Sequence, residues 1–81
     1  MSDSEMPSRK TLAVALDACA ARADMIDKEP ATAKQCWFLA GLILDGGWVA
    51  DARDAFDSNT VLTKREASRR IEFYLEQKDA E

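Results

Sequence analysis

The sequence lacks histidine and has few of the residue types from which catalytic and metal sites are built. Its 81 residues include two cysteines, three glycines, two prolines and one tyrosine. Cys19 and Cys36 lie seventeen residues apart with no CxxC pair, so a closed zinc site has too few soft ligands. Cysteine catalysis also needs a partnered base, and no GxGxxG or Walker-type loop is present. We therefore predict that the protein binds no cofactor or metal and is not an enzyme.

Long hydrophobic runs are also missing. The longest, from Cys36 to Leu44, has nine residues, about half of the roughly 20 that a membrane-spanning helix needs. The first ten residues, MSDSEMPSRK, are polar and of mixed charge, unlike a secretory signal. We predict no membrane contact and a reducing, cytoplasmic setting in which Cys19 and Cys36 are buried thiols.

The scarcity of glycine and proline, with 47% hydrophobic and 32% charged residues, favours helices. We predict one all-α domain over residues 8–78, with a flexible leader at 1–7 and a frayed tail at 79–81. The domain is a small bundle of three long helices. A short additional helix is predicted around residues 48–56, with an ordered loop as the alternative. A chain of this length buries only about 60 to 65% of its unfolded surface, so the core is small.

The first helix is predicted over residues 9–27, with Ser8 as its N-cap. Apolar residues at helical spacing form its core face: Leu12, Leu16, Cys19, Ala23 and Ile26. A second apolar stripe repeats the spacing: Val14, Ala18, Ala21 and Met25. Either the short helix packs on this stripe, or the stripe is a self-association or partner surface that allows a homodimer.

The second helix is predicted from residue 33 to about Asp45. Thr32 and Gln35 have the spacing of a capping box at its start, and the glycines at 46–47 end it. Apolar side chains between residues 36 and 44 cover nearly its whole circumference. A narrow polar strip remains: Lys34, Gly41 and Asp45. We therefore expect this helix at the centre of the domain, packed on several sides.

The last helix is predicted over residues 64–77. Thr63 and Glu66 repeat the capping-box spacing, and Leu62 and Ala67 are placed as a hydrophobic staple. Its predicted core face is short: Ala67, Ile71, Tyr74 and Leu75, with the stem of Lys78. Helical packing alone thus explains much of this segment.

Two segments of the chain, TAKQCWFLAGLI and LTKREASRRIEFYL, resemble a small uncharacterised helical domain found alone or appended to bacterial and phage proteins. The pattern of that domain is TxKQxxxLxxL, a variable link, and LTKxEASxxIxxL, and the resemblance covers residues 32–75. These positions carry it: Thr32, Lys34, Gln35, Leu39, Leu42, Leu62, Thr63, Lys64, Glu66, Ala67, Ser68, Ile71 and Leu75. The resemblance implies a helical fold and a setting in phage biology and DNA metabolism.

The net charge of −4 disfavours a simple duplex-DNA binder, because lysine and arginine supply most of the affinity for phosphates. Four basic residues of the last helix are nevertheless candidates for phosphate contacts: Lys64, Arg65, Arg69 and Arg70. Glu66 and Glu72 stand three or four residues from arginines, and such pairs dilute the local positive potential.

Phe73 projects away from the predicted core, with Arg69 and Arg70 on its N-terminal side. An outward aromatic between arginines has the composition of an interface hot spot. Two alternatives stay open for this side chain, a cation–π pair with Arg69 inside the monomer and a lone exposed apolar residue without function. The candidate partner-binding residues are Arg65, Arg69, Arg70 and Phe73.

One acidic cluster lies beside Trp48 and Phe56, with three-residue spacing: Asp51, Asp54 and Asp57. A carboxylate pair at this spacing can hold a hard cation, whereas solvated charge on a helix accounts for it more simply.

We therefore predict a non-enzymatic protein–protein interaction module. In its most concrete form it is a phage or mobile-element accessory protein that binds and occludes host nucleic-acid machinery. The alternative is a nucleic-acid-associated accessory protein that contacts phosphates through the basic residues of the last helix.

Overall fold

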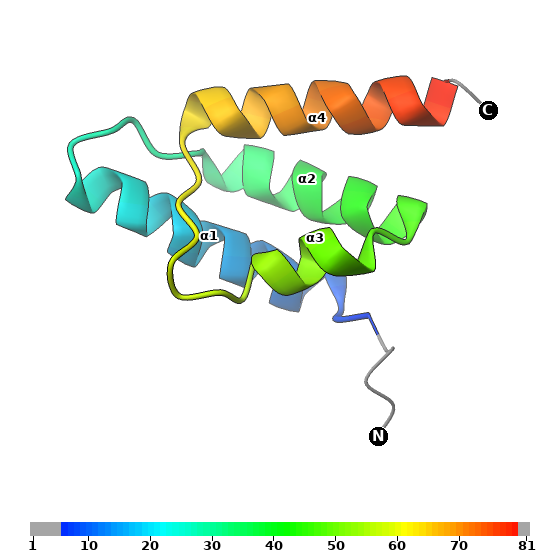
Figure 1. The fold of residues 1–81 in the computed structure, drawn as a ribbon, viewed down its shortest axis with the longest axis horizontal. Helices are drawn as coiled ribbons and strands as arrows, with labels where there is room; N and C mark the ends of the chain where they lie inside the picture. Colours follow the sequence, from blue (N-terminus) through cyan, green and yellow to red (C-terminus); the bar gives the residue numbers. More distant parts are fainter. Residues whose placement is uncertain (1–5, 80–81) are drawn as a thin grey trace.

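Four helices contain most of residues 6–79, the part of the chain that the computed structural model describes (Figure 1). They are α1 (Arg9–Met25), α2 (Ala33–Gly46), α3 (Val49–Asp54) and α4 (Lys64–Asp79). Within the described range no β-strand forms, and an isolated antiparallel bridge joins Pro30 to Thr63. The all-α prediction is confirmed. The predicted leader and tail lie outside the described residues at 1–5 and 80–81, whereas Met6 packs against the core.

The start of α1 and the connector after it follow from local side-chain chemistry. The Ser8 hydroxyl accepts a hydrogen bond from the backbone N–H of Thr11 at 3.2 Å, as expected of an N-cap. The helix ends at Met25 and not at Asp27, because Asp27 has a positive φ of 59° and turns the chain out of the helix. This early end leaves Ile26 54% exposed, so its predicted place in the core is wrong.

Both ends of α2 match the sequence prediction. The Thr32 hydroxyl accepts from the N–H of Gln35, and the Gln35 side chain accepts from the N–H of Thr32, each at 3.0 Å. At the other end Gly47 has φ 67°, a left-handed conformation that glycine adopts without steric cost. The capping box and the glycine stop are therefore present as predicted.

The start of α4 has half of the predicted capping box. Thr63 Oγ1 accepts from the N–H of Glu66 at 3.0 Å, and Leu62 and Ala67 are buried as a staple requires. The Glu66 carboxylate accepts instead from Arg70 Nε at 3.4 Å. The predicted i, i+4 pair of Glu66 and Arg70 is thus confirmed.

Helix α2 is central: α1 packs against it in the opposite direction and α4 in the same direction (Figure 1). The α2–α4 register is constant, since Gln35 bonds Ser68 and Asp45 pairs with Lys78, both thirty-three residues apart. Between the extended segments that precede the two helices, the N–H of Ala31 donates to Leu62 O at 3.2 Å. The two helices therefore start side by side.

The core lies where α2 meets its three neighbours. Its largest fully buried side chains come from α1, α2 and the segment before α4: Leu12, Leu16, Leu39, Ile43, Leu62, Cys19 and Cys36. α3 contributes Ala52, its C-cap residue Ala55 is also buried, and α4 contributes Ala67 and Tyr74. Leu75 is 39% exposed, so its predicted core position is only partly correct.

One side of α2 is open, which the sequence did not predict. Trp37 is 46% exposed and Phe38 is 44% exposed. The physical reason is the number of neighbours: α1 and α4 flank α2, and the six-residue α3 covers one further side. No helix within residues 6–79 packs on the remaining side, which only side chains at its edges, Arg9 and Lys78, approach. We call it the open face, and it comprises Lys34, Trp37, Phe38, Gly41 and Asp45.

The chain from α3 to α4 is fastened to α1 by Arg22. Its Nη1 donates to the carbonyl oxygens of Thr60 at 2.7 Å and of Asp57 at 3.1 Å. The Cys19 thiol donates to Ala55 O at 3.3 Å on the same side of α1. The second apolar stripe of α1 lies elsewhere and is exposed, at 60% for Val14 and 82% for Met25. Of the two alternatives for this stripe, packing by the short helix is therefore wrong.

Candidate functional site

Three aromatic rings gather where α3 begins beside the second half of α4. The ring centroid of Trp48 lies 5.9 Å from that of Phe73 and 5.4 Å from that of Tyr74, and Phe73 meets Tyr74 edge to face at 5.5 Å. Such tilted pairs are favourable arrangements of aromatic quadrupoles. We call Trp48, Phe73 and Tyr74 the aromatic cluster.

Tyr74 anchors this cluster to α3. Its ring is 5% exposed, and its hydroxyl donates to Asp51 Oδ2 at 2.5 Å. Burial raises the pKa of Tyr74 well above its ordinary value, and the Asp51 carboxylate raises this pKa further. The phenol therefore stays a neutral donor, and one member of the predicted acidic cluster is used in holding α3 to α4.

Two glycines position Trp48. Gly47 turns the chain through its left-handed conformation, and the N–H of Trp48 then donates to Ile43 O at 3.1 Å. The indole ring lies over Gly46, where an added Cβ would collide with Nε1. The indole thus rests directly on bare backbone at the end of α2.

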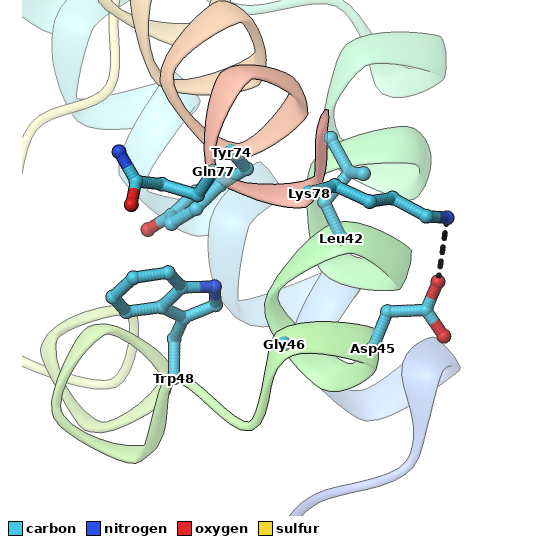
Figure 2. A pocket seen from close by; sticks show the side chains of 7 residues that line it. All are labelled: Leu42, Asp45, Gly46, Trp48, Tyr74, Gln77 and Lys78. Atoms are coloured by element: carbon cyan, nitrogen blue, oxygen red, sulfur yellow. Dashed lines mark hydrogen bonds and ion pairs between the residues drawn. The ribbon is translucent and has the colours of Figure 1, made fainter. Parts of the chain in front are cut away.

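A small cavity of about 250 Å³ opens beside the indole (Figure 2). Its walls come from the end of α2, from Trp48 and from the last turns of α4: Leu42, Asp45, Gly46, Trp48, Tyr74, Gln77 and Lys78. At its edge Lys78 Nζ lies 3.5 Å from Asp45 Oδ2, an exposed pair of small energetic weight. Small-molecule sites usually measure about 300 to 1,000 Å³, so this cavity is better matched to one side chain of a partner.

The four predicted partner-binding residues lie along one side of α4, but they differ in exposure and in their contacts within the molecule. Arg65 and Arg69 are exposed, while Arg70 is half-buried and paired with Glu66. Phe73 is 47% exposed and packs on Trp48 and Tyr74. It is therefore neither a lone aromatic nor the partner of Arg69. Among residues 6–79 the cation–π pair found is Arg9 over Trp37, at 4.2 Å.

The remaining basic residue of the alternative prediction, Lys64, pairs with Glu29 at 3.8 Å. Two of the four candidate phosphate contacts therefore have acidic neighbours, and Arg65 and Arg69 keep exposed charges. A phosphate-binding patch would depend mainly on these two arginines.

The predicted acidic cluster is divided among structural tasks. Asp51 accepts from Tyr74, and Asp57 Oδ1 accepts from the N–H of Asn59 at 2.9 Å within the turn before α4. In the part of the chain that the structure describes, no group of three or more acidic or cysteine side chains is arranged to hold a metal ion. The carboxylates of this cluster thus point to packing and turn formation.

Both thiols are free and fully buried, as predicted. Burial raises the pKa of Cys36 to about 12, and the nearby Asp17 carboxylate contributes in the same direction. Burial also raises the pKa of Cys19, against an opposing effect of the Arg22 guanidinium. A thiolate is the reactive form of cysteine, so both side chains behave as small core residues.

The open face of α2 is the surface that sequence reasoning missed. Trp37 and Phe38 line a groove that continues to Ile71 on α4. Arg9 closes one edge: its Nε donates to Trp37 O at 3.0 Å, and its guanidinium lies over Gly41, where an added Cβ would be 2.8 Å from Cζ. The polar strip of Lys34, Gly41 and Asp45 was the available signal, because a strip of this kind marks the side of a helix that faces water.

Comparison with protein-family models, with curated proteins and with solved structures found no match for this chain. None of the helices within residues 6–79 combines the length and the apolar character needed to cross a membrane.

Proposed function

We propose that the protein is a non-enzymatic protein–protein interaction module that binds its partner through the aromatic cluster and the arginines beside it. The observation that carries this proposal is Phe73, which is 47% exposed while its ring is held by Trp48 and Tyr74. An aromatic side chain that is both exposed and already ordered loses little conformational entropy when a partner covers it.

The surroundings of Phe73 support this role. Arg65, Arg69 and Phe73 are spaced four residues apart and form a row on α4. Tryptophan, tyrosine and arginine are the residues enriched in interface hot spots. The cavity of about 250 Å³ shares Trp48 and Tyr74 with the aromatic cluster and can receive one partner side chain. The Phe73 ring, the Arg65 and Arg69 side chains and the cavity beside Trp48 thus form one neighbourhood on the surface.

In its most concrete form, the partner is part of the host nucleic-acid machinery and the protein is a phage or mobile-element accessory protein that occludes it. Support for this form comes from the resemblance of residues 32–75 and from the net charge of −4. Proteins that handle nucleic acids carry basic surfaces, which attract the net negative charge of this protein as a whole, while Arg65 and Arg69 require acidic groups of the partner at the contact itself.

A second candidate function is direct association with nucleic acid. It is favoured by Arg65 and Arg69, whose exposed charges have no acidic partner among the described residues. The overall negative charge opposes it, since each phosphate contact depends on a cation that releases counterions.

Affinity capture from the source cells tests the first proposal. The baits are the full chain and its Phe73→Ser and Arg69→Glu variants, and Ile26→Ser is the matched control, since Ile26 is exposed to a similar degree at the far end of α1. We expect one protein that the wild type and Ile26→Ser retain and that both test variants lose. Retention of the same protein by Phe73→Ser and Arg69→Glu would exclude the proposed surface.

A salt titration separates the two candidates. Binding to single- or double-stranded DNA that weakens steeply as log[salt] rises, and that Arg65→Glu abolishes, would favour the nucleic-acid function. Absence of DNA binding at low salt would remove that candidate.

A further inference from the structure

The midline of the open face has the spacing of a coiled-coil seam. Lys34, Phe38, Gly41 and Asp45 follow one another at intervals of four, three and four residues, on the far side of α2 from the buried Leu39 and Ile43. This order of intervals is the same in both chain directions. An antiparallel copy of α2 therefore meets the seam in register.

That register brings complementary groups together. In an antiparallel pair with its two-fold axis between residues 39 and 40, Lys34 faces Asp45 of the second copy, and Phe38 faces Gly41 of the second copy. The same two contacts recur on the other side of the axis, as the symmetry of a C2 interface requires. Charge thus matches this arrangement, and at the position of Gly41 the facing Phe38 meets the Arg9 guanidinium that lies over the glycine.

We infer that a second copy of this chain covers the open face, with the two α2 helices antiparallel and related by a two-fold axis. The inferred interface leaves Phe73 outside the open face, and it shares one residue, Asp45, with the cavity beside Trp48. It makes the protein a homodimer whose aromatic clusters stay free for partners.

The space over Gly41 is taken by the Arg9 side chain, whose Cζ would lie 2.8 Å from an added Cβ. At Gly41 the backbone has no side chain, and the Arg9 guanidinium lies over it while stacking on Trp37 at 4.2 Å. Phe38 of the second copy would therefore rest on a flat surface of backbone and guanidinium. Aromatic rings pack favourably on a guanidinium plane.

The end charges favour a second copy over an unrelated apolar helix. Lys34 and Asp45 are both exposed, and the pair of Asp45 with Lys78 is weak. Opposite charges at the two ends of a symmetric seam select the antiparallel copy and disfavour a parallel one, in which like charges would meet. The molecule is also flat, 36 by 33 by 18 Å, so its broad side can supply the roughly 800 Å² per partner of a stable interface.

Sedimentation equilibrium of the full chain tests the inference. The mass should rise with concentration from 9.0 kDa toward twice that value, within a range on the order of 1 μM to 1 mM. Phe38→Asp should raise the dimer dissociation constant about 100-fold or more, since a buried aromatic anchor is lost twice. Lys34→Asp and Asp45→Lys should each raise it about 10-fold, because two attractive end contacts become repulsive.

Mixing the two charge variants is the decisive measurement. In a mixed dimer, Asp at position 34 faces Lys at position 45, and the native Asp45 faces the native Lys34, so all end contacts are attractive again. An equimolar mixture should associate to within about threefold of the wild type. Lys34 and Asp45 are both exposed, so loss of folding does not imitate this rescue.

Three results would overturn the inference. One is a chain that stays at 9.0 kDa throughout the concentration range. Another is a charge-variant mixture that stays as dissociated as its components. The third is a dimer that Phe38→Asp leaves intact and Met25→Asp dissociates, which would place self-association on the exposed stripe of α1.

Discussion

Two tryptophans border α2 and are held in different ways: Trp48 follows its C-terminal end at the start of α3, and Trp37 lies on the open face. Trp48 is fixed by a glycine turn, by Gly46 beneath it and by two rings of α4. The ring of Trp37, by contrast, is contacted by the Arg9 guanidinium, whose Nε also donates to the carbonyl oxygen of Trp37. This difference shows that the hydrophobicity of α2 does not by itself determine which of its sides another segment covers. A covering element needs its own fastening points, and residues 48–62 have them in Tyr74 and Arg22.

The two tryptophans give the largest expected contrast. Trp48→Ala should lower the free energy of unfolding by about 3 kcal/mol, because it removes most of the packing between α3 and α4. Trp37→Ala should lower it by about 1 kcal/mol at concentrations where the chain is monomeric, since nearly half of the side chain is already in water. Urea denaturation followed by far-UV circular dichroism measures both values.

Equal losses for the two tryptophan variants would show that the open face is covered within the monomer. Concentration separates that outcome from dimerisation. Under the inferred dimer, the loss caused by Trp37→Ala grows with protein concentration, whereas the loss caused by Trp48→Ala does not.

Arg22 offers the next largest effect. Arg22→Ala leaves the carbonyl oxygens of Asp57 and Thr60 without their donor, and should lower the free energy of unfolding by about 2 kcal/mol. Arg65→Ala is the matched control, because Arg65 is exposed on α4 and its loss should change stability by less than about 0.5 kcal/mol. Chemical denaturation compares the pair. A similar small effect for both would mean that water replaces the guanidinium at this turn.

The parts of the fold set by neighbouring residues were predictable from the sequence. Ser8, Thr32 and Thr63 each cap a helix through a bond that spans three residues, and Gly47 ends α2 through its own φ angle. Each of these helix caps depends on only a few neighbouring residues, so it can be recognised in the sequence.

The open face was not predictable in this way. An apolar helix such as α2 predicts burial all round, but burial depends on how many other elements exist to surround it. The support of Phe73 was missed for a related reason, since Trp48 lies twenty-five residues earlier and no periodicity links the two. The role of Arg22 could not be predicted either, because its acceptors are backbone carbonyls, which every residue has.

Alkaline pH should lower the free energy of unfolding by less than the Arg22→Ala substitution does. The pKa of Cys36 is raised from 9.0 to about 12, so above pH 9 the unfolded chain releases a proton that the folded chain keeps. Stability therefore falls as pH rises, by about 1 to 1.5 kcal/mol at pH 10 from this group. Tyr74 and Cys19 have raised pKa values and act in the same direction at high pH.

The Cys36→Ala variant isolates the thiol in this comparison. It should cost about 1 kcal/mol at pH 7 through lost packing and almost nothing at pH 10, because the ionisation penalty disappears with the thiol. Urea midpoints at the two pH values supply the numbers. A constant difference between wild type and variant would mean that the thiol ionises equally well in both states.

The smallest contrast compares the two glycines over which side chains lie. A Cβ at Gly46 collides with the indole of Trp48, which is held by its neighbours, so Gly46→Ala should cost about 1 kcal/mol. A Cβ at Gly41 meets only the end of the flexible Arg9 side chain, while alanine improves the helix interior by about 1 kcal/mol. Gly41→Ala should therefore be neutral or slightly stabilising in the monomer. If Gly41→Ala cost as much as Gly46→Ala, the Arg9 side chain would be held as rigidly as Trp48. The open face would then have a fixed side-chain arrangement at Gly41.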